Sequence, residues 1–116
     1  MWPKNLPPPP PVPAGVREML KDYPEILQDL QDVLNDVVIK PAYGTPPFEM
    51  AIWRLKDTLE DWLVEAREAH EAAEAGGDAQ TIERAKKKWL SIAHSRHAIY
   101  NGGLKEYFEQ YRGAFE

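Results

Sequence analysis

Apolar and small side chains recur at alternating spacings of four and three residues through the second half of this chain. The first run comprises Phe48, Ile52, Leu55, Leu59, Trp62, Ala66, Ala69 and Ala73. After two glycines the rhythm resumes with Ile82, Ala85, Trp89, Ile92, Arg96 and Ile99. A heptad spacing of this kind places one apolar seam along each of two helices. The sequence therefore predicts an all-α fold, a small helical bundle built on a long antiparallel helical hairpin (about 45–75 and 78–100).

The predicted hairpin has a specific register. Folding the chain about Gly77 places Ala66 opposite Trp89 and Trp62 opposite Ile92. A large side chain then faces a small one at the first of these levels, which is how facing helices interdigitate without voids. Toward the glycine turn both seams become alanine, so we expect the tip of the hairpin to be thin.

Shorter segments flank the hairpin. The apolar spacing predicts a short helix over 16–22, a helix over 24–38 that begins at Pro24, and a short C-terminal helix over 104–114. Thr45 is expected to cap the first hairpin helix, with two prolines in its first turn. The proline-rich residues 1–15 are expected to form an extended arm, and residues 16–116 a single helical domain.

Composition excludes several classes of protein. The 116 residues include 14 Lys and Arg against 19 Asp and Glu, a formal net charge of -5, which argues against nucleic acid as a partner. Without cysteine there can be no disulfide and no thiolate-bound metal. No run approaches the length of a membrane span, and the first residues lack the apolar core of a signal peptide. We therefore expect a cytoplasmic protein with no membrane partner.

The N-terminal arm carries the sequence LPPPPPVP over 6–13. Consecutive prolines fix φ and remove backbone donors, so this segment is expected to be a polyproline II helix. It resembles the ligands of aromatic-lined grooves in EVH1, SH3 and WW domains, which makes Pro8, Pro9 and Pro10 candidate partner-binding residues. The alternatives are a disordered tail and an arm laid across the protein's own bundle, anchored by Trp2 and Leu6.

An acidic row follows one side of the predicted 24–38 helix. Its members, at spacings of three and four, are Glu25, Asp29, Asp32 and Asp36. Like charges at this spacing repel, so the row requires solvent or a cationic partner. That partner is either the basic run of the return helix or an external protein.

The basic run consists of Arg84, Lys86, Lys87 and Lys88. We expect these residues to form salt bridges across the hairpin with Glu65, Glu68 and Glu71, rather than to bind phosphate. The three histidines, His70, His94 and His97, lie too far apart in the hairpin register to converge on a metal ion. No spacing indicates a catalytic constellation or a cofactor site, so we expect neither metal, cofactor nor enzymatic activity.

These patterns predict a non-catalytic protein–protein interaction module, an adaptor or regulator that self-associates, with homodimerisation possible. Tyr and Trp are favoured in contact surfaces, so Trp53, Tyr107 and Tyr111 are candidate exposed anchors in addition to the acidic row. In composition the chain is similar to small uncharacterised helical proteins of bacteria and their phages. The alternative is therefore a phage or mobile-element accessory protein that inhibits a host nucleic-acid-binding protein through the acidic helix.

Overall fold

A computed structural model describes residues 2–41, 44–100 and 102–115, and all regular structure in these ranges is helical. In chain order the elements are α1 (Ala14–Met19), α2 (Pro24–Ile39), α3 (Pro47–Gly76), α4 (Ala79–Ser95), the 3-10 turn η1 (Arg96–Ala98), α5 (Leu104–Gln110) and the 3-10 turn η2 (Arg112–Phe115). The predicted fold class is confirmed.

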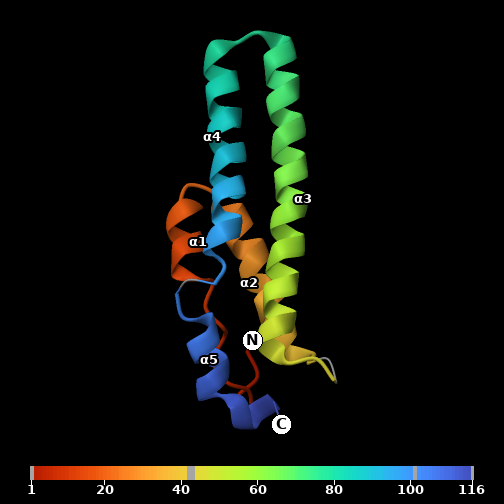
Figure 1. The fold of residues 1–116 in the computed structure, drawn as a ribbon, viewed down its shortest axis with the longest axis vertical. Helices are drawn as coiled ribbons and strands as arrows, with labels where there is room; N and C mark the ends of the chain where they lie inside the picture. Colours follow the sequence, from red (N-terminus) through yellow and green to blue (C-terminus); the bar gives the residue numbers. More distant parts are fainter. Residues whose placement is uncertain (1, 42–43, 101, 116) are drawn as a thin grey trace.

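The hairpin is the longest feature of the molecule, which measures 55 × 27 × 23 Å. Figure 1 shows α3 and α4 running side by side in opposite directions and joined at one end. Gly77 makes the turn with φ of 76°, a left-handed conformation that ends α3 and that glycine adopts without strain. Asp78 then caps α4 by accepting a hydrogen bond from the Thr81 backbone N–H at 3.0 Å. Hydrogen bonds from Thr81 also lower the pKa of the Asp78 carboxyl.

The hydrophobic core lies at the base of the hairpin. There α2 packs along α3, while α1 packs against the lower part of α4 (Figure 1). The fully buried side chains of this core include Leu30, Leu34, Leu55, Leu59 and Ile92. The structure describes every residue between Ala66 and Ile92, and none of their side chains is fully buried. The predicted thin tip is therefore confirmed. No helix in the described ranges combines the length and apolar character needed to cross a membrane.

The N-terminus of α3 differs from the prediction. The helix begins at Pro47, its N-cap is Pro46, and no side chain accepts a capping hydrogen bond, so the assignment of Thr45 as the cap is wrong. A side-chain cap accepts from the N–H groups of the second or third helical residue. Counted from Thr45, the second helical residue is Pro47, which has no N–H to donate, so one of the two possible donors is missing. The 30-residue helix therefore starts without a side-chain cap.

The proline-rich arm is part of the packed molecule. Gln31 of α2 donates to the carbonyl of Pro10 at 2.7 Å, and the Tyr107 hydroxyl of α5 donates to the carbonyl of Pro8 at 2.6 Å. Val12 lies in the core, and Trp2 and Leu6 pack against it. Of the three alternatives, the arm laid across the protein's own bundle is confirmed.

Candidate protein-interaction surface

One side of the hairpin is left uncovered by α2. Trp53, Lys56 and Glu60 share this side of α3 because residues three and four apart are neighbours on a helix. Trp62 lies roughly opposite Trp53 around the helix, and its indole N–H donates to Asp29 of α2 at 2.8 Å. Because Trp62 points toward α2, Trp53 points away from it.

The 3-10 turn η1 at the end of α4 and the residues that follow it complete this surface. The Lys56 ammonium lies 5.7 Å from the centroid of the Tyr100 ring, and the Arg96 guanidinium forms an ion pair with Glu60. His97 lies with these four residues around a shallow hollow. We call the six residues Trp53, Lys56, Glu60, Arg96, His97 and Tyr100 the hairpin face.

The hairpin face exposes two large aromatic side chains at the densest part of the bundle. Trp53 is 54% exposed and Tyr100 is 59% exposed, although the core lies directly beneath them. Trp, Tyr and Arg are the residues that contribute most often to binding energy at protein interfaces. Trp53 was predicted to be an exposed anchor, and its exposure is confirmed. The other five residues were missed, because heptad spacing marks the buried seam and says little about which exposed residues gather across two helices.

The acidic row is divided between two environments. Glu25 forms an ion pair with Lys88 at 3.4 Å, and Asp29 accepts the hydrogen bond from Trp62. Asp32 and Asp36 are exposed, and neither forms an ion pair with a described residue. Half of the row therefore stabilises the bundle, and half faces solvent.

The basic run pairs with residues other than those predicted. Lys87 pairs with Asp22 at 3.6 Å, and Lys88 pairs with Glu25, whereas Glu65, Glu68 and Glu71 form no salt bridge with any described residue. Lys88 also lies 5.5 Å from the Trp62 ring and 5.7 Å from the Tyr23 ring. The prediction was wrong because Lys88 lies on the side of α4 that faces α2, so its nearest carboxylates belong to that helix.

Two of the three predicted aromatic anchors belong to the interior. Tyr107 is 7% exposed, so the expectation that it is an exposed anchor is wrong; the arm covers it. Tyr111 is half-buried, with its ring 5.0 Å from that of Tyr107. Among the predicted prolines, Pro8 and Pro9 are exposed and Pro10 is buried.

The three histidines lie in different surroundings. His70 on α3 forms a pair with Glu74 at 3.1 Å, and its ring lies 5.3 Å from that of Trp89. His97 belongs to the hairpin face, and His94 is exposed on α4. Within the described ranges no three His, Cys, Asp or Glu side chains are grouped so as to hold a metal ion.

Fold and surface together define an all-α hairpin bundle with a polyproline arm packed on its base. Comparison with models of protein families, with curated proteins and with solved structures finds no match to this chain.

Proposed function

We propose that this chain is a non-catalytic protein–protein interaction module whose hairpin face binds a protein partner. The observation that carries the proposal is the exposure of two aromatic side chains, Trp53 on α3 and Tyr100 after η1, the second of which lies against the Lys56 ammonium. An isolated exposed apolar residue requires no explanation, but aromatic residues grouped with an arginine match the composition of interface hot spots.

The geometry of the hairpin face suits a preformed contact surface. Trp53 and Tyr100 each have few rotatable bonds, and both are attached to regular helices or turns above a rigid core, so ordering them on binding costs little. The Arg96–Glu60 pair fixes both charges beside the hollow. A partner that buries Trp53 and Tyr100 would gain apolar contact and meet an ordered polar rim.

Site-specific photo-crosslinking in the native host tests this proposal. The benzophenone amino acid is introduced at Trp53 in one strain and at Tyr100 in another, and the control carries it at Met19. Met19 is a matched position because it is 44% exposed and, as a residue of α1, does not belong to the hairpin face. The proposal expects the same discrete adduct from the first two positions and none from the third.

A second variant separates binding from folding. Trp53→Ala should leave the melting temperature nearly unchanged, since the side chain is half exposed, and should abolish the adduct formed at Tyr100. An adduct containing two copies of this chain would identify the partner as a second copy. If position 19 gives adducts as readily as 53 and 100, or if no position gives any, the hairpin face is not a binding surface.

Inhibition of a host nucleic-acid-binding protein through the acidic helix has less support. Such a function would use all four carboxylates of the row, but Glu25 and Asp29 are already engaged within the bundle. Only Asp32 and Asp36 remain to contact a partner, too short a row to imitate a line of phosphates.

A further inference from the structure

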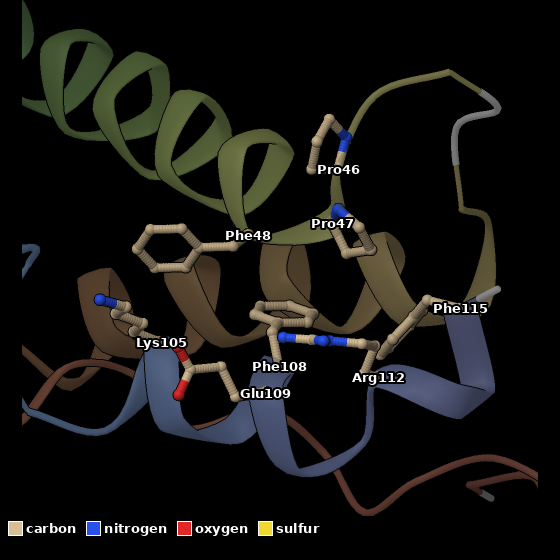
Figure 2. Close-up of a pocket in the computed structure, with 8 residues that line it drawn as sticks. All are labelled: Pro46, Pro47, Phe48, Lys105, Phe108, Glu109, Arg112 and Phe115. Carbon is tan, nitrogen blue, oxygen red and sulfur yellow. The ribbon is translucent and has the colours of Figure 1, made fainter.

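A separate cavity lies at the base of the bundle, away from the hairpin face. Its volume is about 350 Å³, within the range of small-molecule sites. The first turn of α3 forms one wall, and α5 with η2 forms the other (Figure 2). The lining residues are Pro46, Pro47, Phe48, Lys105, Phe108, Glu109, Arg112 and Phe115.

The floor of the cavity is aromatic. The rings of Phe48 and Phe108 lie 6.5 Å apart and inclined at 63°, and the ring of Phe115 lies 5.4 Å from that of Phe108. Edge-to-face arrangements of this kind accept a further ring at favourable geometry. Proline rings at positions 46 and 47 close the upper side and cannot change φ, so the wall needs no ordering when a ligand enters.

The rim of the cavity is electropositive. Lys105 and Arg112 reach it from α5 and η2, and neither forms an ion pair with a described residue. The uncapped N-terminus of α3 lies at the same cavity, and the positive end of a long helix favours an anion there. Glu109 is the one acidic residue of the lining, so the side chains of the rim carry a net positive charge.

We propose that this cavity binds a small aromatic carboxylate, with its ring against the rings of Phe48 and Phe108 and its carboxylate at Lys105 and Arg112. The aromatic floor selects a flat apolar body, and the rim selects an anionic head. The site uses none of the residues of the hairpin face, so it goes beyond the proposed protein-binding function and is tested independently of it.

The test is a titration of the full-length, isotope-labelled protein followed by amide NMR. The probes are 3-phenylpropionate, its neutral isostere 3-phenylpropanamide, and the aliphatic acid hexanoate. The proposal expects saturable shifts confined to residues 48–50 and 104–115 with 3-phenylpropionate, and about tenfold weaker binding of the amide, because charge-assisted hydrogen bonds are lost. Hexanoate should also bind more weakly, because it lacks a ring.

Charge-removing variants complete the test. Lys105→Gln and Arg112→Gln should each weaken 3-phenylpropionate binding by about three- to tenfold without affecting the amide. Lys86→Gln, an exposed lysine on α4, is the matched control and should bind like the wild type. Equal binding of acid and amide, tighter binding of hexanoate, or the absence of saturable shifts would each overturn the proposal. The amide spectrum of every variant shows directly whether it is folded.

Discussion

At the scale of single residues, polar groups join segments that are distant in the sequence. Lys88 of α4 contacts Glu25 and the ring of Tyr23 beside α2, and also the ring of Trp62 on α3. A partly buried cation between two aromatic rings and a carboxylate gains from each contact while losing part of its hydration. The orientation of α2 in the bundle is thus fixed by specific polar contacts as well as by apolar burial.

Tyr107 makes stability sensitive to alkaline pH. Burial, with a smaller contribution from Tyr111, raises the pKa of Tyr107 to about 12 from its ordinary value of 10.0. Between these two pH values the unfolded chain loses the phenolic proton while the folded chain keeps it, so the free energy of unfolding must fall as pH rises. The contribution is fully present below pH 10.0 and is lost by about 12.

Urea denaturation at a series of pH values measures this effect. We expect Tyr107→Phe to show a smaller loss of stability over this range than the wild type, and to be about 0.5–1.5 kcal/mol less stable at neutral pH through loss of the bond to Pro8. Tyr100→Phe, at an exposed position, should follow the wild type at every pH. Identical alkaline profiles for all three proteins would show that Tyr107 is not protected by the arm.

At the scale of elements, the turns that join the helices differ in how tightly they are packed. Gly77 and Gly102 both have positive φ, 76° and 106°, but only Gly102 lies against other atoms. Its carbonyl accepts the Ala14 N–H at 3.2 Å, and an added Cβ would lie 2.5 Å from that nitrogen. The connection before α5 is therefore a packing contact with α1, whereas the hairpin turn is open to solvent.

Alanine substitution at these two glycines should separate strain from steric conflict. Gly77→Ala should cost about 1–2 kcal/mol, the penalty for a left-handed residue that carries a Cβ. Gly102→Ala should cost more, because the same penalty is added to a collision with the backbone of α1. Thermal and urea denaturation measure both differences. Equal losses would mean that α1 moves aside without resistance.

The elements differ in how far the sequence could predict them. The hairpin was predictable because many apolar residues at heptad spacing, such as Leu55 and Ile92, all indicate the same buried face of the two helices. The place where the N-terminal arm packs could not be predicted, because polyproline II has no internal hydrogen bonds and its carbonyls can accept from any donor. The burial of Tyr107 and the division of the acidic row both depend on tertiary placement that local spacing does not encode. Helical periodicity alone predicts that Trp53 is exposed. It could not predict the position of Tyr100, because that residue lies in a turn after η1.

At the scale of the whole molecule, stability is concentrated at one end. The base contains α1, α2, α5 and the arm around a continuous core, whereas the far half of the hairpin has only α3 and α4 (Figure 1). Between Ala66 and Ile92 the two helices gain little from burial. A helical pair without a core opens locally at a small fraction of the global free energy.

Hydrogen–deuterium exchange resolved by peptide should report this gradient. Amides of residues 70–85 should exchange by local opening, much faster than those of 55–60 and 26–38, which should exchange only on global unfolding. Adding urea below the unfolding transition should accelerate the second group and leave the first nearly unchanged. Uniform protection along α3 would instead mean that the hairpin unfolds as one unit.

The contact between Tyr107 and Pro8 spans 99 positions. Because synthesis proceeds from the N-terminal end, the prolines emerge from the ribosome well before α5, which carries Tyr107. Gln31 of α2 can bond to Pro10 early in synthesis, whereas Pro8 has to wait for Tyr107, and closing that longer loop costs more conformational entropy. The bond between Tyr107 and Pro8 therefore forms only after α5 has been synthesised.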